Sequence, residues 1–540
     1  MKQLHSSRAF SAILAALAMF AGPALRAATN EVSGYLYGTH NWVATNTYIL
    51  KGFTYVMSNT VLNIEAGTVV KGVSGSGTSS SAANDFGTLF VCQGGKLNAL
   101  GTANSPVVFT AEADDVTDSG DLTFPTRGLW GGVVLFGNAR VNNPAWTTNN
   151  VSYDIYEGLP DTLVTNTTVG SPFLGQVDYI HRFGGSNDDD SSGVMRYASV
   201  RHGGKKLTTN KEINGWSMGG VGRGTTMEYL EAYCIADDGF EFFGGSVNTK
   251  HLVSAFNDDD AFDTDQGYNG KNQFWFAIQE PGAKDNGAEQ NGQPEPNDVY
   301  VAGAQPLPNY VVRNATLIGA GSTTTGNNAL RFRRGNMSSW INSVFTGFGG
   351  IRVLISDDGV STPTVANNIW FDFAGGTGDD HGGTYVPAAS NPVVDPQLRG
   401  ISRTANGDLN PTVASTSPVY SWFTSTPADG FYTSVSYVGA FDQENWAQDW
   451  SGLDHEGFLA ATAKSAATPV NVVAVTVTSN ADGSLATVSY PTTAGTEYKV
   501  QSTTDVATWS DETSWTAGTG ATASVNAAVT TKKIFRVITR

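Results

Sequence analysis

Two acidic stretches with the same internal spacing contain the residues best suited to chemistry. Residues 235–245 read IADDGFEFFGG, and 22 residues later residues 257–267 read NDDDAFDTDQG. At this offset three pairs of carboxylates coincide: Asp237 with Asp259, Asp238 with Asp260, and Glu241 with Asp263. Calcium takes roughly six to eight oxygen ligands and prefers carboxylates, so these six residues are candidate metal ligands.

Stacking like charges one strand apart is unfavourable unless something relieves the repulsion. A calcium ion, protonation, or splaying into water with backbone N–H partners would each relieve it. Asp also occurs at tight corners simply because it bonds locally to the backbone, and no glutamate closes a calcium loop here at the required position. The pattern leaves both alternatives open, a calcium site and a solvated or backbone-bonded corner.

The acidic stretches belong to a series of repeats. The 22-residue offset also aligns Leu230 with Leu252 and Phe240 with Phe262. A second set, RNATLIGAG (313–321), INSVFTGFG (341–349) and NNIWFDFAG (367–375), aligns Asn314, Asn342 and Asn368, and also Leu317, Phe345 and Phe371. Repeats of about 20–30 residues built from short strands predict a solenoid whose coils stack about 4.8 Å apart.

Several segments resemble known β-helix proteins. The strings VLNIEAGTVVKG, LNALGTANSPVVFT and LWGGVVLFGNA resemble the first coils of secreted bacterial β-helix proteins. The run from INGWSMGG to NQFWFAI, with the closing YVGAFDQENWAQDW, resembles a family of exported right-handed parallel β-helix proteins of Gram-negative bacteria. The resemblance covers roughly residues 45–455. It implies an all-β fold, a right-handed parallel β-helix, and export, but no established activity.

Polysaccharide lyases with a β-helix suggest one enzymatic scheme, in which carboxylate-bound calcium neutralises a uronate while a nearby Arg or Lys removes a proton. The run SVRHGGKK provides Arg201, His202, Lys205 and Lys206 as candidate bases. A general base must lie within hydrogen-bond reach of its proton. Glycoside hydrolysis would instead need two carboxylates about 5–10 Å apart, and the acidic ladder offers many such pairs.

Composition and charge exclude several classes. The 540-residue chain has 62 Gly, 15% charged residues and a formal net charge of −18. Turn-rich composition indicates an all-β protein, and the acidic charge argues against nucleic acid as a partner. Residues 1–28 have the pattern of a signal peptide, with Lys2, Arg8 and an apolar run to Ala21. No other stretch approaches the roughly 20 apolar residues of a membrane-spanning helix.

The C-terminal part has a different composition. A small-residue linker over residues 456–470 precedes alternating strands at 473–478, 485–490, 497–502 and 533–538. These predict a small antiparallel β-sandwich over residues 471–540, which resembles C-terminal modules of secreted bacterial proteins. Cys92 and Cys234 both lie in apolar strand patterns, so we predict two buried free thiols in preference to a disulfide.

Aromatic and basic residues are further candidates for sugar binding. The tryptophans of the coils would stack on sugars only if they faced outward, and inward packing is the simpler expectation. They are Trp216, Trp275, Trp340 and Trp370. The run ALRFRRGN could hold an anionic sugar, but pairing of its arginines (Arg331, Arg333 and Arg334) with nearby acidic corners is the expectation.

The sequence therefore predicts an exported protein of the extracellular space or outer surface of a Gram-negative bacterium. Its β-helix spans residues 29–455 and is followed by the sandwich module. A structural, adhesive or carbohydrate-contacting role, with calcium in the ladder and a polysaccharide or cell-surface component as partner, is the first interpretation. A calcium-dependent polysaccharide lyase or glycoside hydrolase acting on acidic polysaccharide is the alternative.

Overall fold

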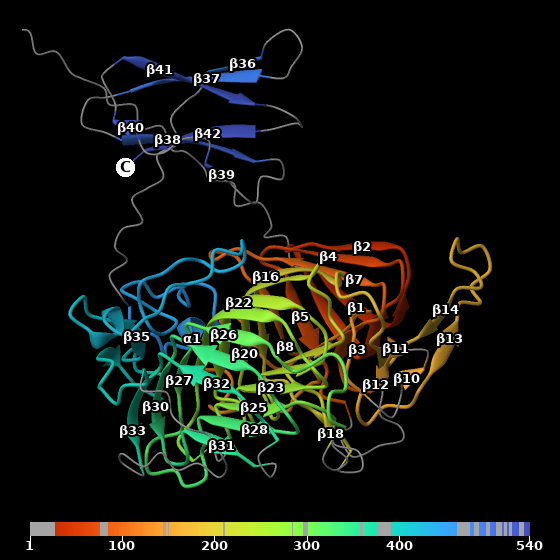
Figure 1. Cartoon of the computed structure of the whole chain (residues 1–540). Helices are drawn as coiled ribbons and strands as arrows, with labels where there is room; N and C mark the ends of the chain where they lie inside the picture. The colour runs from red at the N-terminus through yellow and green to blue at the C-terminus, as the bar shows by residue number, and fades with distance from the viewer. Residues whose placement is uncertain are drawn as a thin grey trace, which may run out of the picture. The chain divides into compact units, whose positions relative to one another are not determined.

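In the computed structural model the chain forms two compact units (Figure 1). The first contains the described residues up to Asp442 together with Trp446–Phe458, and the second contains Gln443–Asn445 and the described residues from Leu459 onward. The structure describes residues 28–75, 85–143, 147–148, 151–208, 211–282, 285–294, 301–356, 360–374, 390–461, 476–479, 485–492, 497–503, 510–511, 516–517, 521–528 and 534–539. The predicted signal peptide, Ala28 excepted, and most of the predicted linker lie outside these ranges.

The first unit is a parallel β-helix, as predicted. Its strands form one long all-parallel sheet that coils into three stacks. The first stack holds β2 (Thr39–Trp42), β4 (Val61–Glu65), β7 (Lys96–Leu100), the leading halves of β16 (Gly193–Arg201), β20 (Thr226–Tyr233), β22 (Asn248–Ala255) and β24 (Lys271–Ile278), then β26 (Val311–Arg313), β29 (Ser339–Ile341) and β32 (Thr364–Ala366).

The other two stacks continue each coil. The second holds the leading halves of β1 (Ala28–Leu36) and β3 (Asn46–Val56), then β5 (Val69–Gly72), β8 (Val107–Ala111), the trailing halves of β16 to β24, β27 (Thr316–Ile318), β30 (Val344–Phe348) and β33 (Ile369–Phe373). The third holds the trailing halves of β1 and β3, then β6 (Thr88–Val91), β9 (Val133–Phe136), β19 (Trp216–Gly219), β21 (Phe240–Phe243), β23 (Phe262–Asp265), β25 (Ala288–Asn291), β28 (Leu330–Arg333) and β31 (Val353–Ile355).

A sharp corner separates the first stack from the second. From β16 onward, one residue per coil adopts a left-handed backbone there, for example Tyr197 (φ 46°), Tyr229 (φ 56°) and His251 (φ 56°). Such a conformation is strained for a non-glycine residue. Stacking offsets part of the cost, because the rings of Tyr229 and His251 lie 4.1 Å apart and those of Tyr197 and Tyr229 lie 4.4 Å apart.

The core of the coil consists of inward-pointing apolar and aromatic residues. Phe240 and Phe262 stack with centroids 5.7 Å apart, and Phe262 stacks on Trp275 at 4.3 Å. The four tryptophans of the coils, which would have to face outward to stack on sugars, are all buried in this core: Trp216, Trp275, Trp340 and Trp370. Cys92 and Cys234 are buried free thiols, which confirms the prediction.

Insertions between coils add small antiparallel pairs. Between β9 and β16, β12 (Asp154–Ile155) pairs with β15 (Arg182–Phe183), and β13 (Leu163–Thr165) pairs with β14 (Val177–Tyr179). Between β16 and β19, β17 (Lys206–Thr208) pairs with β18 (Lys211–Glu212). Of these, β12, β15 and the β17–β18 hairpin matter most, because their residues line a cleft beside the third stack.

The second unit contains antiparallel strands, as predicted. One sheet orders β36 (Thr476–Ser479), β37 (Leu485–Pro491) and β41 (Thr522–Ala528), and the other joins β38 (Glu497–Thr503) to β39 (Ser510–Asp511), β40 (Thr516–Ala517) and β42 (Ile534–Thr539). Both contribute to one apolar core, which includes Val488, Tyr490, Val500 and Val537. Among the described residues of the chain, no helix has the length and apolar character needed to cross a bilayer.

Candidate metal-binding cleft

The acidic residues lie on the third stack, where β21, β23 and β25 pair in register. Glu241 lies opposite Asp263, and Asp263 lies opposite Glu289. Because side chains alternate along a strand, the phenylalanines Phe240 and Phe262 point into the core and these carboxylates point outward. The structure therefore confirms that coil stacking brings equivalent acidic residues together. Their strands lie about 4.8 Å apart in the direction of the backbone hydrogen bonds.

A second acidic row belongs to the turns that lead into these strands. Asp238 Oδ1 accepts a hydrogen bond of 2.9 Å from the backbone N–H of Asp260. Asp260 Oδ1 in turn accepts a bond of 2.5 Å from the backbone N–H of Asn286 on the following coil. These two carboxylates fasten one turn to the next, which is the structural role expected for Asp at a solenoid corner.

The two rows, Asp260 excepted, form the floor of a cleft of about 850 Å³. Its walls come from the insertions, because residues of β12, β15 and the β17–β18 hairpin line it. The charged and polar residues lining it are Asp154, Glu157, Lys206, Lys211, Glu212, Asp237, Asp238, Glu241, Asp259, Asp263, Asp265, Gln266, Glu289, Asn291 and Arg333.

The basic residues of the cleft pair with carboxylates of its walls and floor. Lys206 Nζ lies 2.6 Å from Glu212 Oε1, and Lys211 pairs with Glu157. Glu289 forms ion pairs with two arginines of ALRFRRGN: Oε2 lies 2.6 Å from Arg331 Nη1, and Oε1 lies 2.5 Å from Arg333 Nη2. Both arginines therefore pair with an acidic residue, as expected. In the part of the chain that the structure describes, no ion pair reaches the six predicted ligands, Asp237, Asp238, Glu241, Asp259, Asp260 and Asp263.

Burial and mutual repulsion disfavour the ionised forms of these acids. Burial, followed by the charge of Asp285, raises the pKa of Asp259 to about 7. The other five predicted ligands have pKa values raised well above the ordinary range, with burial as the largest cause and neighbouring carboxylates next. They are Asp237, Asp238, Glu241, Asp260 and Asp263.

Two oxygen atoms in the cleft are buried without any hydrogen bond. They are Asp263 Oδ1 and Gln266 Oε1. Gln266 is only 5% exposed, and its amide donates to Asp154 Oδ2 at 2.9 Å. A buried acceptor with no donor costs free energy, so these oxygens fit a cation better than they fit an empty cleft.

The carboxylates form overlapping groups suited to a cation. Four sets of three have ligand atoms within 4.8 Å of one another. They are Asp237, Asp238 and Asp259; Asp238, Glu241 and Asp263; Asp259, Asp260 and Asp285; and Asp260, Asp263 and Glu289. Every donor is a carboxylate oxygen, which suits hard cations such as calcium or magnesium over zinc. These buried clusters could hold a metal.

The predicted catalytic residues lie away from the cleft lining. Arg201 is 3% exposed, and its Nε donates to Ser199 Oγ at 2.9 Å. His202 is 5% exposed and bonds the carbonyl of Thr126 through Nδ1 at 2.7 Å. Lys205 is half-buried, with Nζ 6.0 Å from the Phe86 ring centroid. Only Lys206, from the same run, lines the cleft.

Sequence reasoning missed the walls. Asp154, Glu157 and Glu212 lie in insertions that have no counterpart in the repeats, so no spacing pointed to them. Glu289 follows Asp263 by 26 residues instead of 22, because the loops before β24 and β25 are both longer than their counterparts in the preceding coil. The 22-residue offset could not detect it.

Fold and site together define a parallel β-helix protein with an acidic lateral cleft. The family described as pectate-lyase-like β-helix domain matches residues 34–163 and 173–371, which is more than half of the chain. The chain belongs to this family. No curated protein and no solved structure matches it significantly.

Proposed function

We propose that this chain is an exported protein whose acidic cleft holds calcium and contacts polysaccharide through it, in a structural or adhesive role at or outside the cell surface. The observation that carries the proposal is the buried carboxylate cluster: Asp263 Oδ1 has no hydrogen-bond donor, and none of the six predicted ligands has an ion-pair partner among the described residues. A divalent cation would supply the missing positive charge. With coordination positions left over, it would also bind the carboxylate groups of an acidic polysaccharide.

Export and the second unit complete the proposal. The signal-peptide pattern of residues 1–28 supports export. The second unit has its own antiparallel core, and we assign it to attachment at the surface or to glycan contact. In this account the β-helix contacts the polysaccharide and the second unit retains the protein where it acts.

Binding to immobilised acidic and neutral polysaccharides, in calcium and in chelator, tests this function. We expect calcium-dependent binding of acidic polysaccharide that is lost in the double variant Asp259→Asn with Asp263→Asn. This pair removes one ligand from each of the four groups but spares Asp238 and Asp260, which fasten the turns. Asp189→Asn is the control, because Asp189 is exposed and already paired with Arg223. Binding that ignores calcium and the double variant would refute the proposal.

Cleavage of acidic polysaccharide is the second candidate, and one observation favours it. Lys206 and Lys211 line the same cleft as the carboxylates, so two candidate bases lie beside the proposed cation site. A lyase would release unsaturated uronates, seen by ultraviolet absorbance, and Lys206→Ala or Lys211→Ala would lower the rate. Absence of any product from acidic polysaccharides in calcium would leave the binding role alone.

A further inference from the structure

After its last coil the chain turns back along the β-helix. The backbone N–H of Gly439 donates to the carbonyl of Asn342 at 2.7 Å, and Asn314 Nδ2 donates to the carbonyl of Tyr437 at 2.9 Å. Farther on, His455 Nε2 lies 2.9 Å from the carbonyl of Val116. Residues 437–442 and 446–458, here called the strap, therefore run from late coils to early ones.

The strap covers the stacked corner residues between the first two stacks. The Trp446 ring lies 5.0 Å from that of His251, edge to face. The Trp450 ring lies 5.9 Å from Tyr197 and 6.3 Å from Tyr229, also edge to face. Trp450 is 1% exposed. The aromatic ladder that stabilises the corner is thus completed by two tryptophans from the strap.

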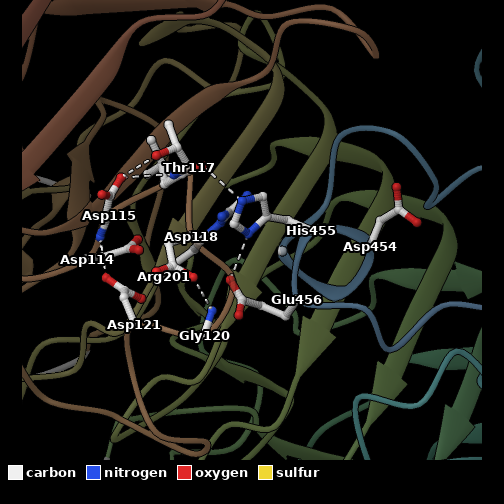
Figure 2. A network of polar contacts seen from close by, with 12 residues as sticks. Asp114, Asp115, Thr117, Asp118, Gly120, Asp121, Arg201, Asp454, His455 and Glu456 are labelled. Atoms are coloured by element: carbon white, nitrogen blue, oxygen red, sulfur yellow. Dashed lines mark hydrogen bonds and ion pairs between the residues drawn. The ribbon is translucent and has the colours of Figure 1, made fainter.

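A buried carboxylate fastens the strap near its end. Glu231, on β20, is fully buried and accepts hydrogen bonds from the backbone N–H groups of Gly452 (2.5 Å) and Leu453 (3.1 Å) at the start of α1 (Gly452–His455). The Ser199 hydroxyl donates a further hydrogen bond of 2.5 Å to Glu231 Oε2, and Ser199 Oγ itself accepts one from Arg201 Nε. Figure 2 shows Arg201 together with His455 and Glu456, next to the loop of residues 114–121.

This arrangement gives Arg201 a place in the fold. Burial raises the pKa of the Glu231 carboxyl, and the positive charge of Arg201 opposes that shift and counters part of the cost of burying the carboxylate. Charge-assisted hydrogen bonds of this kind are stronger than neutral ones. Glu231, Ser199 and Arg201 therefore form one buried anchor for the strap, and we call this group the Glu231 anchor.

We propose that the strap is a mechanical clasp that transmits force from the second unit to the early coils. Each coil of a solenoid contacts only its neighbours, so force applied at the last coil would peel strands away one at a time. Here the chain leaves the first unit after Phe458, whose ring lies 4.8 Å from that of Phe256 and 5.1 Å from that of Phe124. Phe458 and Gly457 also accept backbone hydrogen bonds from Leu409 and Gly407. Force from the C-terminal side therefore meets these contacts and then the Glu231 anchor before any strand pair.

The inference rests on the proposed role of the second unit in attachment, and single-molecule force spectroscopy of the full chain tests it. One handle is placed at the C-terminus and the other at Thr39→Cys, an exposed position on β2. Under constant force we expect release of the strap as one event that precedes any loss of coils. Glu231→Gln should shorten the strap lifetime at least about tenfold, because hydrogen bonds to a charged group are lost.

Controls separate the clasp from general stability and from the cleft. Glu228→Gln, on the same strand but paired with Arg196, should leave the strap lifetime unchanged. Trp450→Phe provides a second weakened clasp if Glu231→Gln folds poorly. Pulling in chelator makes the strap lifetime independent of calcium. Failure of the cleft proposal would then appear in the polysaccharide-binding assay and would leave the strap lifetimes unchanged. Equal strap lifetimes in wild type, Glu231→Gln and Trp450→Phe would overturn the clasp.

Discussion

At the residue scale, aspartates of one motif do two different things. Asp238 and Asp260 accept backbone N–H groups from the next coil and so fasten the turns. Asp263 keeps a buried oxygen with no donor. Corner chemistry therefore accounts for one oxygen of Asp238 and one of Asp260, whereas Asp263 offers the proposed cation an oxygen that has no donor.

The raised pKa of Asp259 predicts a pH dependence of stability. Its folded value of about 7 exceeds the ordinary 3.8, so the folded state binds the proton more tightly than the unfolded state does. Stability from this group is full below pH 3.8 and is lost as the pH rises toward 7. In chelator, we expect the melting temperature to fall between about pH 5 and pH 7, the upper part of that window.

Asp259→Asn should flatten this profile, because the titrating group is gone. Saturating calcium should flatten it as well, since a cation favours the ionised carboxylate. Melting curves across pH, with and without calcium, measure both effects. A profile that is equally steep in Asp259→Asn would assign the pH dependence to other carboxylates.

Arg201 and Lys206 should differ in the kind of effect that their loss produces. Arg201→Ala removes the countercharge of buried Glu231, so we expect the free energy of unfolding to fall by about 3 kcal/mol. Lys206→Ala removes a side chain that is 67% exposed and pairs at the cleft wall, and should change it by less than about 0.5 kcal/mol. Urea unfolding of both variants measures these free energies. An Arg201→Ala variant as stable as the wild type would contradict the role of Arg201 in the anchor.

At the element scale, the register of the strands determines which residues are buried. The repeat alignment placed Asn368 over Asn342 and Phe371 over Phe345, and it was wrong by one residue at this coil. The structure pairs Phe345 with Trp370 instead. Trp370 is 3% exposed and Phe371 is 36% exposed. A shift of one residue exchanges the faces of a strand.

A pair of substitutions tests this register. Trp370→Ala should cost about 3–5 kcal/mol of unfolding free energy, because it opens a cavity beside Phe345, whose ring lies 4.3 Å away. Phe371→Ala should cost less than about 1 kcal/mol because its side chain is partly in solvent. Chemical denaturation measures the two. Equal losses would place both rings in the core and contradict the observed pairing.

Sequence predicted the floor of the cleft but not its walls, for a physical reason. Coils of equal length superpose, so the offset between Glu241 and Asp263 gave their pairing directly. Insertions such as the β17–β18 hairpin are set by long-range packing that no repeat encodes. For the same reason Lys206 and Arg201, five residues apart, could not be assigned to different surroundings from sequence alone.

At the scale of the whole molecule, the two units have separate cores. The core of the second unit consists of residues from its own strands, among them Val488, Val500 and Val537. We therefore expect two transitions in calorimetry of the full chain. Calcium should raise the melting temperature of the β-helix transition and leave the other unchanged, because the carboxylate groups all lie in the first unit. One transition, or a calcium shift in both, would contradict this separation.

Calcium binding itself is the most direct test of the central claim. Isothermal titration of the mature protein with calcium, beside the Asp259→Asn, Asp263→Asn double variant and the Asp189→Asn control, measures affinity and stoichiometry. We predict saturable binding in wild type and control, and loss of at least about tenfold in affinity in the double variant, which lacks a ligand in every group. No binding by the wild-type protein, or equal binding by the double variant, would show that the carboxylate floor is not a calcium site.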